Sequence, residues 1–472
     1  MLSYIRILRS FLAAISLILP TVGQTPAKLD IRYLTNIEAE PVIQSAGGLL
    51  PKELASMDGP SAKTVWDTWI SKSDREIRNR LEQGDEDSIV NLLLFGTSFT
   101  KQPRLTDSQV DQLAKAGAKD RTKVYETILR QRLDDLSAAF AATGDDQRLR
   151  FAKDHLTAKL KVRVDTPSGK KAIEDFLVLS LRRVLNESSG FADLIEQARK
   201  NQEDVFVVRS QLFSRRGLSS DTSLKPNWAI EKALTELKEK GTVKRALRVA
   251  IVGPGLDFTD KDEGYDFYPP QTIQPFAVIE SLLRLEMTDP ASLKIDTYDL
   301  SPKVNSHIAG FAAMARAGHN YPIQLPLAAD RKWTPEFVSY WKDFGNKIAL
   351  PARASQSVGV PDVLIRAIDV KASFLSKIKP YDTNIVLQSP VLAEADRYDL
   401  IIGTNIFVYY DAFFQALAMK NLEKMLRVGG VLLSNNALVE FPFTNVHSIG
   451  YTKAIYSDKK ADGDAIIWYQ RK

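Results

Sequence analysis

The chain has 472 residues, of which 44% are hydrophobic and 26% charged, and its formal net charge is +5 at pH 7. This is the composition of an ordinary globular protein, and the length favours two folded units. Because cysteine is absent, disulfides, thiolate metal sites and cysteine nucleophiles are excluded. The four histidines are far apart in the sequence, so we predict no metal site. The small net charge, without a long basic tract, predicts no nucleic-acid partner.

The first 23 residues have the layout of a secretory signal peptide. Two arginines precede an apolar run from Phe11 to Leu19, and Pro20 and small residues follow. This order suits cleavage before Gln24, and the run is too short for a comfortable membrane span. We therefore predict an exported protein, periplasmic or secreted, with no transmembrane segment beyond the signal peptide. The alternative is an uncleaved N-terminus, which leaves the protein cytoplasmic or membrane-anchored.

Residues 24–240 have mainly helical periodicity. Apolar residues three to five apart run from Val124 through Leu133 to Phe140, and a more apolar stretch covers 176–185. Such spacing lays an apolar stripe along one face of a helix. The Pro- and Gly-containing stretch 165–169 marks a break between helices. We predict a mainly α-helical N-terminal domain of unknown role.

A loop-like stretch at 215–223 forms the joint between this region and the C-terminal half. A helix is expected from Pro226 to Lys240, with Asn227 as its N-cap and Gly241 as its stop. The predicted domains are therefore 24–240 and 241–472.

After Gly241, short β-branched runs alternate with helical ones. The expected strands cover 247–252, 293–299, 384–388, 398–404, 431–434, 449–456 and 464–469, and the expected helices cover 274–286, 302–317 and 412–426. Two insertions are expected near 258–274 and 330–380, the second irregular except for an aromatic helix at 334–344. This alternation predicts an α/β fold with a doubly wound, Rossmann-like seven-stranded sheet. Its last two strands predict a terminal antiparallel hairpin.

The first expected strand runs into Gly253-Pro254-Gly255, and Asp257 follows. Glycines let the backbone turn sharply and approach a ligand closely. The third glycine of the dinucleotide fingerprint is missing, so an ordinary tight turn is the alternative.

Asp299 ends the second expected strand. A carboxylate at this position can accept hydrogen bonds from both ribose hydroxyls of a nucleoside. The alternative is an N-cap of the next helix.

Thr404 and Asn405 end a later apolar strand, at the place where an open α/β sheet positions its ligand. An aromatic stretch with Tyr409 and Tyr410, a helix, a Gly429-Gly430 turn and a further strand follow.

These three constellations, in this order, resemble class I S-adenosylmethionine-dependent methyltransferases. The segments "YDLIIGTN" at 398–405 and "MLRVGGVLL" at 425–433 carry most of the resemblance, which covers Arg245 to Lys472. "TNIFVYYD" at 404–411 and "DTNIVLQ" at 382–388 are locally similar to the chemotaxis-receptor glutamate methyltransferases.

The resemblance implies S-adenosyl-L-methionine as the cofactor. Carried over by position, Gly253 and Gly255 would approach its methionine part, and Asp299 would hold the ribose. Asn384 would lie near the adenine, and Thr404 and Asn405 would border the methyl group. The family's first strand usually ends in an acidic residue, whereas here it ends in Ile251-Val252, and Asp257 is the candidate substitute. The loop 258–274 is either a lid with Tyr268 stacking on the cofactor or a surface insertion packed by its own aromatics.

Methyl transfer from a sulfonium is an in-line displacement, for which the enzyme mainly positions donor and acceptor. The sequence therefore need not show a catalytic dyad, and the catalytic residues are left unassigned. Asn405, Tyr409, Tyr410 and His447 are candidates to line the site. The predicted function is a methyltransferase acting on an unidentified acceptor, either a small molecule or a protein side chain. Because S-adenosylmethionine is kept in the cytoplasm, an exported enzyme would have little cofactor. An exported non-catalytic binding protein is therefore one alternative, and a nicotinamide-dependent oxidoreductase is the other.

Overall fold

The computed structural model describes residues 29–472, apart from 56, 58, 107–108, 111, 113–128, 143, 145, 202–207, 209–212, 215, 260–262, 357–359 and 460–461. The predicted signal peptide lies outside the described residues and stays a prediction, as do Val124 and Ile128 of the first predicted helical stripe. Each helix in the described part is too short or too polar to cross a membrane.

Seven strands form one mixed sheet in the order β11-β12-β10-β9-β2-β3-β7. Their bounds are β2 (Arg248–Val252), β3 (Lys294–Asp299), β7 (Ile378–Asp382), β9 (Tyr398–Ile402), β10 (Leu426–Ser434), β11 (Val446–Ile455) and β12 (Gly463–Arg471). The first five run parallel, β12 pairs antiparallel with β10, and β11 pairs antiparallel with β12. The seven-stranded mixed sheet that the sequence predicts is therefore present.

Strand β2 lies at the centre of this sheet, between β3 and β9. Its side chains alternate between two buried clusters: Val249 and Ile251 face one, and Ala250 and Val252 face the other. A strand covered on both faces is apolar throughout rather than alternating, which is why this run could be recognised in the sequence.

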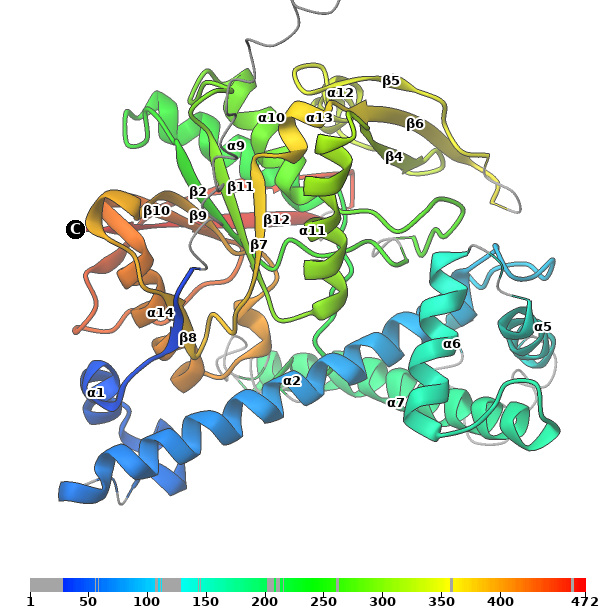
Figure 1. The fold of residues 1–472 in the computed structure, drawn as a ribbon, viewed down its shortest axis with the longest axis horizontal. Helices are drawn as coiled ribbons and strands as arrows, with labels where there is room; N and C mark the ends of the chain where they lie inside the picture. The colour runs from blue at the N-terminus through cyan, green and yellow to red at the C-terminus, as the bar shows by residue number, and fades with distance from the viewer. Residues whose placement is uncertain are drawn as a thin grey trace, which may run out of the picture.

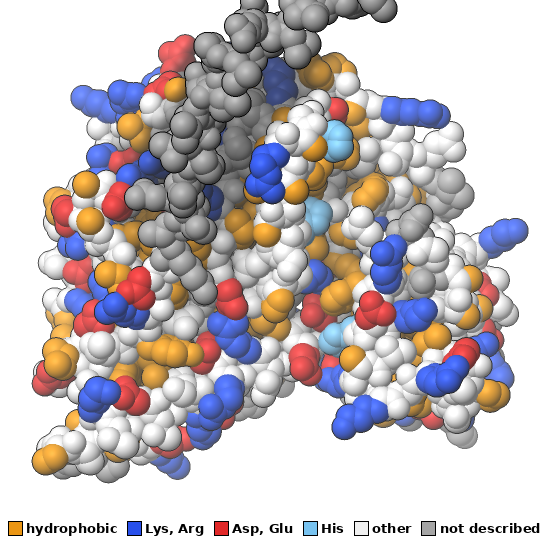
Figure 2. Space-filling view, in the orientation of Figure 1, with side chains coloured by type: hydrophobic (Ala, Val, Ile, Leu, Met, Phe, Trp, Pro, Cys, Tyr) orange, Lys and Arg blue, Asp and Glu red, His pale blue; other side chains and the backbone are white. Residues whose placement is uncertain are grey.

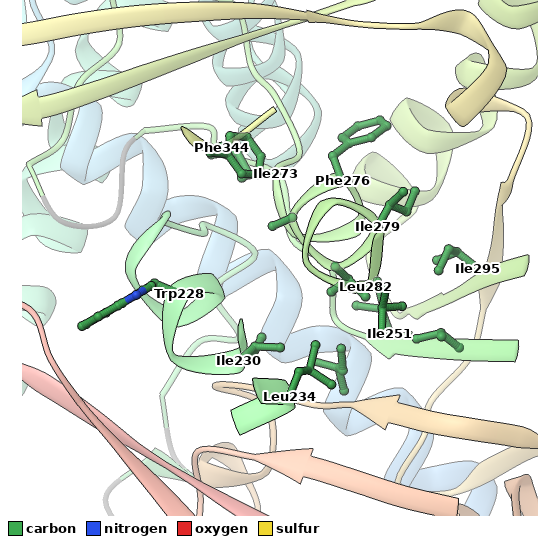
Figure 3. Close-up of a cluster of buried hydrophobic side chains, with 14 of the residues drawn as sticks. Trp228, Ile230, Leu234, Ile251, Ile273, Phe276, Ile279, Leu282, Ile295 and Phe344 are labelled. Atoms are coloured by element: carbon green, nitrogen blue, oxygen red, sulfur yellow. The ribbon is translucent and has the colours of Figure 1, made fainter. Parts of the chain in front are cut away.

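Helices cover both faces of the sheet. One face carries α9 (Lys225–Glu239), α10 (Gln274–Arg284) and α11 (Pro302–Arg316), and the other carries α1 (Asn36–Ser45), α2 (Ala62–Phe95) and α14 (Ala412–Met425). Figure 3 shows the first cluster, in which Leu234 of α9 and Leu282 of α10 lie near Ile251, and Trp228 of α9 and Phe276 of α10 lie farther out. Removing a ring such as Phe276 from this core is expected to cost about 3–5 kcal/mol.

The start of α9 differs from the prediction. The helix begins at Lys225, and Asn227 lies inside its first turn with its side chain donating to the Ser223 carbonyl oxygen at 3.0 Å. The predicted N-cap role of Asn227 is therefore wrong. Gly241 follows the helix with a φ of 71°, a left-handed conformation that suits a glycine at a helix end.

The described part of the second insertion contains regular helices and strands, so the prediction of an irregular segment is wrong. Three antiparallel strands, β4 (Tyr321–Ala328), β6 (Val363–Val370) and β5 (Ala349–Ala352), form a separate sheet with β6 in the middle. The helices α12 (Pro335–Asp343) and α13 (Ala372–Leu375) accompany it. Pro322, Pro326 and Pro351 lie in the two edge strands, where a missing N–H is tolerated. These prolines masked the strand pattern in the sequence.

The third strand of the main sheet also differs. It is β7, at 378–382, and the predicted strand 384–388 is instead a turn that leads into the short β8 (Gln388–Pro390). Strand β8 pairs with β1 (Ile31–Tyr33) from the start of the described chain. In β10, Gly429 has a φ of 79° at an irregularity in the pairing with β9, so the predicted Gly-Gly turn lies within a longer strand.

In the described part of the N-terminal region, the long elements are helices, and β1 is a short strand. The helices α5 (Arg130–Ala141), α6 (Gln147–Leu160) and α7 (Pro167–Lys200) pack on α2 and on one another. Short 3₁₀ turns complete the described elements: Gly47–Leu49, Lys52–Leu54, Gly59–Ser61, Glu394–Asp396 and Phe407–Tyr409. Figure 1 shows α2 crossing from the side of α1 and α14 to the group formed by α5, α6 and α7. This long helix brings N-terminal residues to the edge of the sheet.

Candidate functional site

A cavity lies at the carboxyl ends of the central strands, with about 820 Å³ of empty space that includes its opening to solvent. Its floor comes from the ends of three neighbouring strands and the loops that follow them: Val252 of β2 with Gly253 and Gly255 after it, Tyr298 and Asp299 of β3, and Thr404 and Asn405 after β9. From β2 the chain continues to β3 on one side of the sheet, and it returns to β9 on the other side. The cavity is therefore at the topological switch point, where open α/β sheets bind their ligands.

The glycine loop follows β2 directly. Gly253 and Gly255 have φ values of 64° and 72°, and the Gly253 N–H donates to the Tyr298 carbonyl oxygen at 2.8 Å. A Cβ at Gly253 would lie 2.1 Å from Cδ1 of Ile406. The backbone conformation therefore favours glycine here, and the end of the Ile406 side chain would have to move to admit a Cβ.

Asp299 is partly buried in the cavity wall. Its Oδ1 accepts from the Ser301 N–H at 2.7 Å, while the N-cap of α11 is Ser301, whose hydroxyl accepts from Val304. Asp299 is thus not the N-cap. Burial raises the pKa of Asp299 to about 7, although the Ser301 N–H, Lys303 and the Gly255 N–H oppose that shift. Its carboxylate is therefore poised to gain from further hydrogen-bond donors.

Thr404 and Asn405 both line the cavity, and neighbouring side chains hold them. The Gln274 amide donates to the Thr404 hydroxyl at 3.0 Å. Asn405 has a φ of 59°, a conformation that asparagine tolerates better than most residues. Asn435 fixes it by accepting from the Asn405 N–H at 2.7 Å and donating to its side-chain oxygen at 2.8 Å.

Two of the predicted cofactor-binding residues are not among the residues that line the cavity. The buried Asn384 donates to Asp74 of α2 at 2.7 Å, whereas its neighbours Thr383 and Ile385 line the cavity. Asp257 is 1% exposed and accepts from the Tyr268 hydroxyl at 2.8 Å. Burial raises the pKa of Asp257 to about 7.

Tyr268 does not line the cavity either, so the structure does not place it as a stacking lid. Its ring lies under the guanidinium of Arg148, 5.4 Å away, and that guanidinium also donates to the carbonyl oxygens of Phe258 and Tyr268. The described part of the loop 258–274 therefore packs against α6. His447 is likewise outside the cavity wall, with Nδ1 3.6 Å from Glu440.

The roof of the cavity comes from parts of the chain that the sequence did not associate with the site. Leu81 of α2 contributes, as do 218–222 of the joint and Ile406, Tyr409 and Tyr410 after β9. Of these, only the two tyrosines were candidates. The Gly84–Leu218 contact explains the approach of the joint to α2, because a Cβ at Gly84 would lie 2.0 Å from the Leu218 carbonyl oxygen. No local pattern in the sequence signals such a contact.

Several features of the wall suit a polar ligand that carries hydroxyl and amino groups. Ser220 Oγ, Gln274 Oε1 and Thr383 Oγ1 are buried on this wall without a hydrogen-bond partner in the described part of the chain. An unpaired buried polar group costs about 1–3 kcal/mol, so a ligand that pairs with them would bind favourably. The described residues of the wall include Asp221 and Asp299 but no Lys, Arg or His, which suits a positively charged ligand.

Among the described residues, no group of three His, Asp or Glu side chains is placed to hold a metal ion. On the face shown in Figure 2, acidic and basic side chains are interspersed rather than gathered by sign.

A scan against protein-family models finds no match, and a search of curated proteins finds none either. Among solved structures, N-methyltransferase NodS from Bradyrhizobium japonicum WM9 matches at 13% identity, over 52% of this chain and 94% of its own, with a TM-score of 0.25. The CurJ carbon methyltransferase matches at 13% identity, over 93% and 100%, with a TM-score of 0.25. Human N-acetylserotonin methyltransferase in complex with SAM matches at 9% identity, over 76% and 99%, with a TM-score of 0.22.

These structural neighbours are methyltransferases, at a distance too great for the likeness itself to carry an assignment. What this chain shows by itself is a Rossmann-like seven-stranded mixed sheet with a cavity at its switch point.

Proposed function

We propose that this protein is an S-adenosylmethionine-dependent methyltransferase. One observation carries the proposal: Asp299 at the end of β3 and the glycine loop after β2 line the same cavity at the switch point of the sheet. A carboxylate at the tip of the second strand beside a glycine turn is the arrangement that holds a nucleoside in such folds.

The cavity residues divide by chemistry. Asp299 would accept hydrogen bonds from the ribose hydroxyls, and Thr383 and Ile385 would lie beside the base. Gly253 and Gly255 would leave space for the amino-acid end, and Thr404 and Asn405 would border the transferred group. S-adenosylmethionine, when bound, supplies a methyl group activated by a positively charged sulfur. The carboxylates in the wall, without a basic residue among its described members, favour that charge.

The acceptor would lie under the roof formed by Leu81, Tyr409 and Tyr410. These side chains keep water from the reacting groups and orient the acceptor, which is the main task in a displacement reaction. Because α2 and the joint cover the carboxyl edge of the sheet, we favour a small-molecule acceptor over a protein side chain.

Isothermal titration of S-adenosylhomocysteine into the full chain tests the proposal. We expect micromolar binding, reduced at least tenfold in Asp299→Asn, because the amide cannot provide two charged acceptors to the ribose. The matched control is Asp382→Asn, which removes a carboxylate from the neighbouring register position but not from the cavity wall. Absence of binding by the wild type contradicts the proposal.

Export is a separate prediction with its own test. Mass spectrometry of the N-terminus of protein purified from its own cells should give Gln24 as the first residue. A chain that retains its first 23 residues and fractionates with the cytoplasm refutes export. The protein would then be in the compartment where S-adenosylmethionine is kept.

A further inference from the structure

Asp221 brings a carboxylate to the cavity from the joint between the two halves of the chain. It lines the cavity and is 8% exposed, and its Oδ2 accepts from the Ser88 hydroxyl of α2 at 2.8 Å. The joint is docked on the glycine loop, because the Leu256 N–H donates to the Ser220 carbonyl oxygen at 2.8 Å. Asp221 is therefore held at the glycine-loop end of the cavity.

Asp221 is the carboxylate of the wall at this end, and the described wall residues include no Lys, Arg or His. Asp257 lies close enough for the charge of Asp221 to add to the rise in its pKa, behind the larger effect of burial and despite the opposing Arg148. The Arg148 guanidinium is directed to backbone carbonyl oxygens of the 258–274 loop and does not line the cavity. A buried carboxylate on a wall whose described residues include no basic side chain favours a cationic ligand group.

Gln274 is the second, independent observation. It is 4% exposed and lines the same cavity. Its Nε2 is engaged with Thr404, whereas its Oε1 has no partner in the described part of the chain. An unpaired buried carbonyl oxygen on the wall calls for a donor from a ligand, and an ammonium group offers three donors and no acceptor.

We propose that the glycine-loop end of the cavity is an ammonium subsite, in which the Asp221 carboxylate and Gln274 Oε1 bind the α-amino group of the cofactor's amino-acid end. This inference rests on the proposed function. The sequence resemblance implies an acidic residue at the end of β2, where this chain has Ile251 and Val252. In this proposal Asp221 of the joint takes the place of that residue, so that the N-terminal half of the chain completes the cofactor site.

The test compares two ligands that differ only at the amino group. S-adenosylhomocysteine and its analogue with a hydroxyl in place of the α-amino group are titrated into the wild-type full chain and into Asp221→Asn. We expect Asp221→Asn to weaken binding of S-adenosylhomocysteine by about tenfold or more, the usual worth of a charge-assisted hydrogen bond. Binding of the hydroxyl analogue should change less than threefold.

Asp299→Asn is the matched comparison, because it removes a cavity carboxylate at the ribose end and should weaken both ligands equally. Thermal unfolding of Asp221→Asn shows whether the variant is folded, and Asp221→Glu, which keeps the charge, should restore part of the preference for the amine. If Asp221→Asn weakens both ligands equally, or neither, the ammonium subsite is refuted while the nucleoside site stands. If neither ligand binds the wild type, the proposed function itself fails.

Discussion

The Arg80 guanidinium of α2 donates to the Tyr409 carbonyl oxygen at 3.0 Å, across 329 positions of sequence. The same guanidinium donates to the carbonyl oxygens of Phe213 at 3.0 Å and Arg216 at 2.9 Å. One side chain thus ties α2, the joint and the loop after β9 together over the cavity. The fork of donors on a planar guanidinium makes this three-way contact possible.

Arg80→Ala is expected to loosen the roof. Three carbonyl oxygens lose a charged donor, so we expect a loss of roughly 2–4 kcal/mol in the free energy of unfolding and at least a fivefold loss in S-adenosylhomocysteine affinity. Arg80→Lys should not restore either property, since an ammonium cannot span the three acceptors. Chemical denaturation and calorimetric titration measure the two effects. Arg75→Ala, at an exposed position of the same helix, is the control, and an equal effect there would contradict this role for Arg80.

Gly84→Ala is expected to destabilise the protein, although it replaces glycine within a helix. A Cβ at this position would lie 2.0 Å from the Leu218 carbonyl oxygen, and such overpacking costs about 1–3 kcal/mol. Gly310→Ala in α11 is the matched substitution, with no atom within 4 Å of the new Cβ. It should stabilise by roughly 0.5–1 kcal/mol from helix propensity alone. Thermal unfolding of both variants should show shifts of opposite sign, and shifts of the same sign would refute the close contact with the joint.

Binding of S-adenosylhomocysteine should weaken as the pH falls below about 7. Burial raises the pKa of Asp299 to about 7, and the protonated carboxyl can no longer accept two hydrogen bonds from the ribose. Titrations between pH 5.5 and 8.5 should therefore show an affinity that rises with pH and levels off above the pKa, and this slope should be absent in Asp299→Asn. The same slope in both proteins would assign it to another group.

The same shift has a consequence for stability. A carboxyl whose pKa is higher in the folded than in the unfolded protein lowers stability as the pH rises from about 4 to about 7, because the folded state holds the proton more tightly. At pH 8, Asp299→Asn should be more stable than the wild type by roughly 1–3 kcal/mol, discounted for the partial exposure of the side chain. Near pH 4 this difference should vanish. Equal melting temperatures at pH 8 would contradict the shift.

Asp257→Asn should leave S-adenosylhomocysteine affinity within about threefold of the wild type. The Asp257 carboxylate contacts Tyr268 and Gln271 rather than lining the cavity, so the substitution changes the support of the 258–274 loop and not a ligand contact. A tenfold loss of affinity would contradict this prediction and indicate that Asp257 contacts the ligand. Calorimetric titration at pH 8, where Asp299 is ionised, gives the comparison.

The residues after the central strands show how far the sequence led to the site. Gly253, Asp299 and Thr404 each follow or end a run that the sequence marks as a strand, and the carboxyl ends of parallel strands meet at one edge. Their meeting in one cavity therefore follows from strand order alone. Asn384 shows what the sequence could not predict. In the same turn, the Thr383 side chain lines the cavity, whereas the side chain of the next residue, Asn384, contacts Asp74 of α2.

What the sequence determined by itself is the mixed α/β sheet, its glycine turn and the acidic end of β3, because burial on both faces and helical periodicity leave local patterns in the chain. Only the tertiary structure decided that α2 and the joint roof the cavity, that Asp221 reaches its glycine end, and that β4, β5 and β6 form a second sheet. These depend on contacts between residues far apart in sequence, such as Gly84 with Leu218 and Arg80 with Tyr409. Such contacts are set by packing complementarity, which no local periodicity encodes.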